Sequence, residues 1–160
     1  APVREAIALL RSSLPSTIEL TDRIDADLPP IEGDATQIVQ VVMNLGTNAA
    51  QAMQDDGGTI DVALEEVDVD SGSSVGDGTL PPGTCLQLTV EDDGAGISKP
   101  DLDRIFEPFF STKDTGVGLG LAICQRIIHA HGGELVAKDR EGGGAVLEVI
   151  LPSWECPCAT

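Results

Sequence analysis

The sequence predicts an α+β fold in which helices form a layer on one β-sheet. Three segments carry apolar residues at helical spacing, and five others alternate apolar with polar residues as half-buried strands do. These segments do not follow strict β-α-β alternation, which favours a sheet with hairpins over a purely parallel one. The 160 residues are enough for one domain with its own core. We expect that domain over residues 1–152 and a tail or linker over residues 153–160.

The first half of the chain predicts a helix, a strand and a second helix. A short amphipathic helix starts at Pro2, because proline is tolerated in a first helical turn. A strand is expected from Ile18 to the "LPP" break. Asp34 and Gln37 then form an Asp-x-x-Gln helix start, and an apolar face continues from there to Met53.

The second half predicts strands around one further helix. The expected elements are strands at 60–64 and 86–90, a helix at 117–130 that ends before two glycines, and strands at 135–138 and 145–151. The polar connector "DVDSGSSVGDGTLPPG" is expected to be mobile. Residues 94–116 read as irregular apart from a helical turn at "PDLDRIF".

The net charge, the lack of a long apolar run and the cysteine spacing argue against several classes of function. A formal charge of -18 argues against nucleic acid as a partner, since phosphates need a basic face. No apolar run is long enough for a membrane span and there is no secretion leader, so we expect a soluble, cytoplasmic chain without direct membrane contact. Cys85 and Cys124 are expected as reduced core residues, whereas Cys156 and Cys158 have poor spacing for zinc.

Amide side chains form a stripe on the second helix. Gln37, Gln40, Asn44, Asn48 and Gln51 follow one another at steps of three and four residues. A solvated face is the common explanation of such a stripe, but solvated faces are usually rich in Lys and Glu. Because amides can bind a metal through oxygen and phosphate through nitrogen, we favour a face that meets a ligand.

The segment "VEDDGAGI" ends a strand in an acidic, glycine-containing turn. Asp92 lies at the strand end, where its carboxylate can accept a hydrogen bond from an exocyclic amine such as that of adenine. Gly94 and Gly96 permit a tight turn there. An ordinary Asp-Gly turn would have the same pattern.

The segment "STKDTGVGLGLAI" places a glycine-spaced loop before a helix. It lacks the preceding strand of a dinucleotide-binding fingerprint and the Gly-Lys-Ser/Thr of a Walker loop. Lys113, Gly116, Gly118 and Gly120 remain, at a helix start. Helix N-terminal N–H groups with a single cation suit a triphosphate that carries its own Mg²⁺.

In this order, the motifs resemble the catalytic, ATP-binding domain of a sensor histidine kinase, from the superfamily it shares with gyrase-type ATPases. "QVVMNLGTNAAQAM" is similar to the N box, "DDGAGI" to the first glycine box, "FEPFF" to the F box and "GVGLGLAI" to the second glycine box. "HGGEL" and "GGGAVLEVILP" resemble the closing strands. The resemblance covers residues 3–152 and implies a two-layer α/β sandwich, with a mixed, mostly antiparallel sheet covered on one face by helices.

The resemblance also implies a site for ATP and Mg²⁺. Asn44 would coordinate Mg²⁺, Asn48 would contact phosphate or metal, and Asp92 would accept from the adenine amine. Residues 98–117 would form a mobile ATP lid, with Lys113 reaching the phosphates. The implied nucleotide-binding set is Asn44, Asn48, Asp92, Gly94, Gly96, Ile97, Phe110, Thr112, Lys113, Gly116, Gly118, Leu119, Gly120 and Leu121.

The sequence departs from the family pattern at several positions. Where gyrase-type members carry a glutamate that activates water, the chain has Gln40, which cannot act as a general base. Relatives often carry a basic residue where Ala50 and Gln51 stand, and a threonine or serine where Ala145 stands. We therefore expect a kinase donor domain with little ATP hydrolysis.

The phosphoacceptor is expected outside this chain. His129 and His131 are the only histidines, and neither precedes the acidic residue and proline of a phosphoacceptor helix. A structural role at a helix end is expected for both. The implied partners are a dimerisation and histidine-phosphotransfer domain of the same parent protein and a response regulator receiver domain. Two alternatives remain open: a stand-alone serine kinase of the anti-sigma-factor type, and a nucleotide-binding pseudo-kinase.

Overall fold

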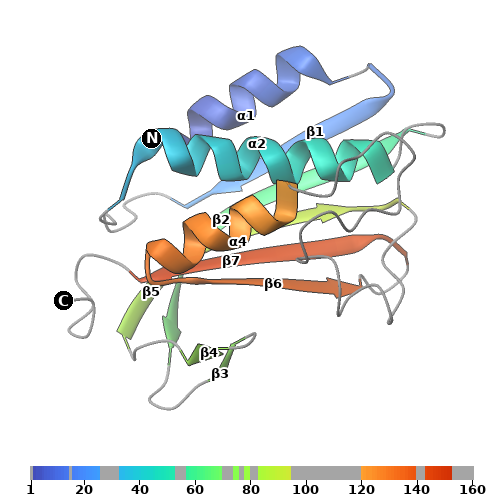
Figure 1. The fold of residues 1–160 in the computed structure, drawn as a ribbon. Coiled ribbons are helices and arrows are strands. Elements are labelled where there is room, and N and C mark those ends of the chain that lie inside the picture. Colours follow the sequence, from blue (N-terminus) through green and yellow to red (C-terminus); the bar gives the residue numbers. More distant parts are fainter. Residues whose placement is uncertain are drawn as a thin grey trace.

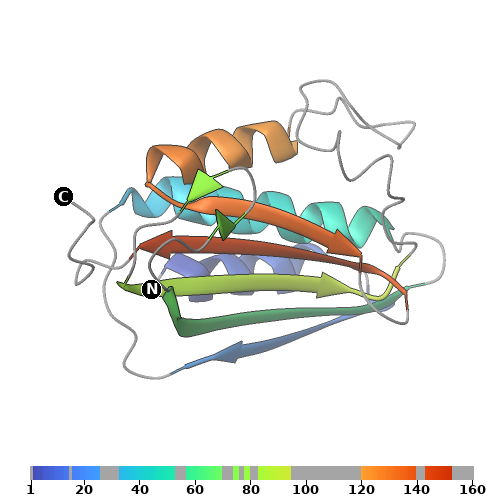
Figure 2. The same cartoon turned by 90° about the horizontal axis from the view of Figure 1, so that it is seen from below.

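In the part of the chain that the structure describes, a five-stranded sheet carries three helices on one of its faces (Figures 1 and 2). The computed structural model describes residues 2–14, 16–25, 33–52, 57–69, 74–75, 78–79, 83–94, 120–139 and 143–152. The helices are α1 (Pro2–Ser13), α2 (Ala35–Ala52) and α4 (Gly120–Ala130). The sheet contains β1 (Ile18–Ile24), β2 (Gly58–Val69), β5 (Gly83–Asp92), β6 (Glu134–Asp139) and β7 (Ala145–Pro152).

The strand order β1-β2-β5-β7-β6 confirms the predicted α+β sandwich with a mixed, mostly antiparallel sheet. Only β1 and β2 pair in parallel, and α2 lies between them in the chain as the crossover that such a pair requires. The other neighbours, β2 with β5, β5 with β7 and β7 with β6, pair antiparallel. Among the described helices, none is long and apolar enough to cross a membrane.

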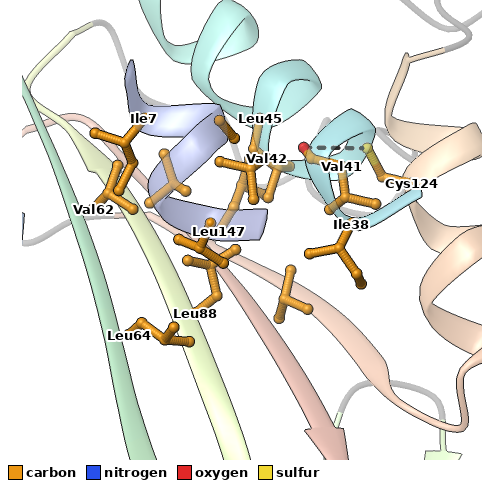
Figure 3. Close-up of a cluster of buried hydrophobic side chains, with 14 of the residues drawn as sticks. Ile7, Ile38, Val41, Val42, Leu45, Val62, Leu64, Leu88, Cys124 and Leu147 are labelled. Carbon is orange, nitrogen blue, oxygen red and sulfur yellow. Dashed lines mark hydrogen bonds between the residues drawn. The ribbon is translucent and has the colours of Figure 1, made fainter. Parts of the chain in front are cut away.

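The core lies between the helices and the sheet and is built from aliphatic side chains (Figure 3). Alternate residues of β2, Ile60, Val62 and Leu64, point into it, as the period of two requires. Helix α2 packs against α1 on one side and α4 on the other, and contributes Val42 and Leu45 to the centre.

The start of α2 is capped as predicted. The Asp34 carboxylate accepts hydrogen bonds from the backbone N–H of Thr36 at 2.8 Å and of Gln37 at 3.4 Å. Asp34 thus satisfies N–H groups that have no partner inside the helix.

Polar residues dominate the opposite face of the sheet. The Arg23 guanidinium lies 2.8 Å from the Asp61 carboxylate, which raises the pKa of Arg23, and Lys138 lies 3.2 Å from Glu148. Such exposed pairs contribute little to stability. Cys85 and Ile150 form a small buried apolar cluster apart from the main core, and two-residue strands β3 (Ser74–Val75) and β4 (Gly78–Thr79) lie on this side of the sheet (Figures 1 and 2).

Several predicted boundaries differ from the structure. The first strand ends at Ile24 and does not continue to the "LPP" break as a strand, since Asp25 already lies outside it. Strands β2 and β5 are longer than predicted because their ladder continues to the pair Val69 and Gly83. The polar connector contains β3 and β4, which its composition did not predict. The turn predicted at "PDLDRIF" and residues 117–119 lie outside the described residues.

Candidate functional site

The amide stripe of α2 changes from exposed to half-buried along the helix. Gln37 and Gln40 are exposed, whereas Asn44 and Asn48 are half-buried. The stripe is therefore not a uniform solvated face, since Asn44 and Asn48 are partly covered.

Asp92 is a buried carboxylate at the end of β5. Its side chain is 5% exposed, and within the described part of the chain no other charged residue is buried. One carboxylate oxygen accepts a hydrogen bond from the backbone N–H of Gly94 at 2.9 Å. This is the Asx turn that the Asp-x-Gly pattern favours. A carboxylate held at this depth at a strand end, and oriented by the turn that follows it, is a candidate for ligand recognition.

Two neighbouring strands hold the Asp92 turn in place. Asp93 accepts a hydrogen bond from the Thr59 N–H at the start of β2, over 3.0 Å. Before β7, Gly144 has a φ of +101°, and a Cβ atom built there would lie 1.9 Å from the Asp92 carbonyl oxygen. Sequence reasoning identified neither Asp93 nor Gly144 as a supporting residue, although the run of three glycines from 142 to 144 marks a close backbone approach.

The elements that carry the predicted site residues converge at one end of the molecule. The second half of α2, the end of β5 and the start of α4 lie at the same end in both orthogonal views (Figures 1 and 2). Helix α2 also contacts both α4 and β5 directly. The half of α2 that carries Asn44 and Asn48 thus lies at the same end of the fold as the end of β5 and the start of α4, although these segments are far apart in the sequence.

The structure describes only part of the predicted nucleotide-binding set. Gly120 is the first residue of α4, and Leu121 is half-buried against the core cluster. Ala145, where relatives often have a hydroxyl, is buried. Outside the described residues lie Gly96, Ile97, Phe110, Thr112, Lys113, Gly116, Gly118 and Leu119, together with Cys156 and Cys158.

Both histidines make contacts at the end of α4, as the structural role predicted for them requires. His131 Nε2 accepts a hydrogen bond from the Asp34 N–H at 3.1 Å, so its Nδ1 carries the proton and donates to the Ile127 carbonyl at 2.7 Å. This ring links the end of α4 to the cap of α2. His129 Nε2 lies 3.2 Å from the Glu134 carboxylate.

Comparison with protein families identifies the class of this domain. Residues 33–155 match the family described as histidine kinase-, DNA gyrase B-, and HSP90-like ATPase. The chain belongs to this family.

The proteins with similar sequences include a sporulation kinase and sensor histidine kinases. It is 34% identical over 152 residues to sporulation kinase E of Bacillus subtilis, covering 94% of this chain and 18% of that protein. It is 38% identical over 135 residues to the sensor histidine kinase ZraS of Salmonella typhimurium, covering 84% of this chain and 26% of that protein. The chain thus spans roughly a fifth to a quarter of the length of these relatives.

Solved structures of histidine kinases have a fold similar to that of this chain. The nucleotide-free catalytic domain of histidine kinase ThkA superposes with a TM-score of 0.75 at 30% identity, covering 95% of this chain and 90% of that one. ThkA in complex with the response regulator protein TrrA gives a TM-score of 0.71 at 27% identity, covering 95% of this chain and 39% of that one. The chain is therefore a catalytic ATPase domain of the histidine kinase type.

Proposed function

We propose that this domain binds Mg·ATP and donates the γ-phosphoryl group to a histidine on a separate dimerisation domain of the same parent protein. The observation that carries the proposal is the buried Asp92 carboxylate, at the same end of the fold as the asparagine half of α2 and the start of α4. In the proposal, the catalytic domain comprises residues 1–152, the location is the cytoplasm, and a response regulator receiver domain is the downstream partner. ThkA, a structural neighbour, is known in complex with a response regulator.

Asp92 is assigned to the adenine. Its carboxylate would accept a hydrogen bond from the exocyclic amine, while the Gly94 N–H keeps the side chain oriented. Guanine presents an oxygen in place of that amine, so a buried carboxylate would meet an acceptor and reject it. This difference supplies base selectivity.

Asn44 and Asn48 are assigned to Mg²⁺ and phosphate. Their amide oxygens are hard, neutral ligands, and both residues are half-buried on the second half of α2, so they fit a magnesium ion that keeps several waters. When bound, Mg²⁺ neutralises charge that develops on the phosphates. The amides orient the triphosphate without adding net charge, and Lys113, together with the lid over residues 98–117, would complete its enclosure.

In phosphoryl transfer, this chain would act by positioning the triphosphate more than by acid-base chemistry. Gln40 is exposed and is an amide, so it cannot activate water for hydrolysis. A histidine nitrogen of the partner domain would attack the γ-phosphorus in line, and ADP would leave. Both histidines of this chain are engaged in contacts at the end of α4, which supports an acceptor elsewhere.

Calorimetric titration of ATP and GTP into the chain, with and without Mg²⁺, tests the binding step. We expect Mg-dependent binding selective for ATP, with negligible hydrolysis. Asp92→Asn should lower ATP affinity about ten- to a hundred-fold, since it replaces a charged acceptor. Asp93→Asn is the matched control, because the Asp93 carboxylate accepts a hydrogen bond from the Thr59 N–H inside the fold, so this variant should keep an ATP affinity near that of the parent chain. Equal affinity of Asp92→Asn and the parent would refute the adenine assignment.

The rival to transfer is a nucleotide-binding pseudo-kinase, which the absence of a basic residue at Ala50 and Gln51 favours. Incubation with Mg·ATP labelled at the γ-phosphate and a dimerisation domain from the parent protein separates the two. Label on the acceptor histidine supports the kinase. Nucleotide binding without any transfer supports the pseudo-kinase.

A further inference from the structure

We propose that His131 is a positioning residue for the nucleotide site, because its ring joins the end of α4 to the start of α2 and thereby fixes how the two helices lie along each other. The inference rests on the proposed function, which assigns Asn44 on α2 to Mg²⁺. The contact lies at the opposite end of both helices from that site (Figure 1).

The His131 ring takes a place that a side chain of α2 could fill. In a capping box, the residue three positions after the cap reaches back to the N–H of the cap residue. Gln37 holds that position relative to Asp34, but Gln37 is exposed and the Asp34 N–H donates to His131 Nε2 at 3.1 Å. A donor that one helix could satisfy by itself therefore connects two helices.

The ring is held from two sides. His131 Nδ1 donates to the Ile127 carbonyl at 2.7 Å, one turn back on α4, which fixes the orientation of the ring. Gly33 lies against the ring on the α2 side, since a Cβ atom built there would come within 2.5 Å of His131 Cδ2. A side chain at position 33 would therefore push the ring away from the Asp34 N–H.

A second contact shows that α2 and α4 keep one register along their length. The helices run antiparallel, since the end of α4 meets the start of α2 (Figure 1). Seven residues after Asp34, the Val41 carbonyl accepts a hydrogen bond from the Cys124 thiol at 3.9 Å (Figure 3). Cys124 is likewise seven residues before His131. The contacts thus repeat after about two turns on both helices.

The same register brings residues of the proposed site level with each other. Asn44 follows Val41 by three residues, and Leu121, the second residue of α4, precedes Cys124 by three. Because a helix rises 1.5 Å per residue, a slide of α2 along α4 by one residue would move Asn44 about 1.5 Å past Leu121. Binding groups must be held to within about 0.5 Å, so the contact that fixes this register supports the site.

Two substitutions at position 131 separate the two hydrogen bonds of the ring. In His131→Gln, the side-chain oxygen is as many bonds from Cβ as Nε2 is, so it can accept from the Asp34 N–H. In His131→Asn, the NH₂ group replaces Nδ1 and can donate to the Ile127 carbonyl, but no atom reaches Asp34. His129→Asn is the matched control, because His129 contacts Glu134 on β6. Thermal unfolding of each variant establishes that it is folded.

The first readout is ATP affinity with Mg²⁺, measured by calorimetry at a temperature where every variant is folded. His131→Asn should lower it about three- to ten-fold, the equivalent of one net hydrogen bond, since binding must then restore a register that the bond no longer holds. His131→Gln and His129→Asn should keep the parent affinity. Parent affinity in His131→Asn overturns the inference, and so does an equal loss in either of the other two variants.

Gly33→Ala disturbs the same contact from the α2 side, because its Cβ atom would displace the ring. We expect the same loss of ATP affinity as in His131→Asn. The double variant should lose no more than either single variant, since both changes remove one hydrogen bond. Losses that add in the double variant would overturn the inference.

A measurement without nucleotide keeps the inference separate from the proposed function. In chain labelled with ¹⁵N and ¹³C, the Asn44 side-chain NH₂ and Leu121 methyl signals should shift in His131→Asn and keep their parent positions in His131→Gln. Unchanged signals in His131→Asn overturn the inference. Absence of Mg-dependent ATP binding in the parent chain, while these signals respond as expected, would refute the proposed function alone.

Discussion

Replacing Gly144 by alanine should both destabilise the fold and displace the candidate adenine site. Gly144 has a φ of +101°, which an L-residue rarely adopts, and this conformation alone should cost about 1–3 kcal/mol. A Cβ atom there would also lie 1.9 Å from the Asp92 carbonyl oxygen and 2.9 Å from Asp93 Cα. Both are backbone atoms, so relief requires the strand to move, which adds about 1–3 kcal/mol of overpacking.

Gly143→Ala is a matched control from the adjacent residue. Gly143 has a φ of +111°, but a Cβ atom there would meet nothing within 4 Å. It therefore carries the conformational cost without the clash. The difference between the two variants isolates the contact with the Asp92 turn.

Urea unfolding followed by circular dichroism measures both free energies. We expect a loss of about 1–3 kcal/mol for Gly143→Ala and about 2–6 kcal/mol for Gly144→Ala. Of the two variants, only Gly144→Ala should also weaken ATP binding when compared at temperatures where it is folded. Equal losses in the two variants would contradict a close backbone contact between Gly144 and the Asp92 turn.

Two further predictions concern the interface between α2 and α4. Burial raises the pKa of the Cys124 thiol to about 11 in the folded state. The protonated thiol therefore contributes its full stabilisation below about pH 9, and the free energy of unfolding should fall by up to about 3 kcal/mol as the pH rises through about 11. Urea unfolding at pH 8, 9 and 10 should show that the free energy of unfolding falls more steeply with pH in the parent chain than in Cys124→Val. An equal fall in the two chains would contradict this. His131→Ala removes the acceptor of the Asp34 N–H and the donor to Ile127, and should cost about 1–3 kcal/mol in urea unfolding. An unchanged midpoint would mean that this link between the helices carries no stability.

Most of the fold could be predicted because the helices and strands follow from patterns among residues that are close together in the sequence. The period of two in β2 and β5 and the helical period in α2 depend on neighbours two to four residues apart. The Asp34 cap and the Asp92 turn are equally local, since each carboxylate bonds to a backbone N–H two residues on. Strand ends were less predictable because they depend on how far the partner strand continues.

The element types, the α+β class and the order of four motifs that resemble a histidine kinase ATP-binding domain all follow from local sequence patterns. Which residues support the site depends instead on contacts between distant segments. The Cys124 contact with Val41 spans 83 residues and the His131 contact with Asp34 spans 97, and no local pattern encodes such pairs. Gly144 and Asp92 meet because antiparallel pairing brings the start of β7 to the end of β5. These contacts depend on register and packing between distant segments, and these exist only once the sheet and its helices have assembled.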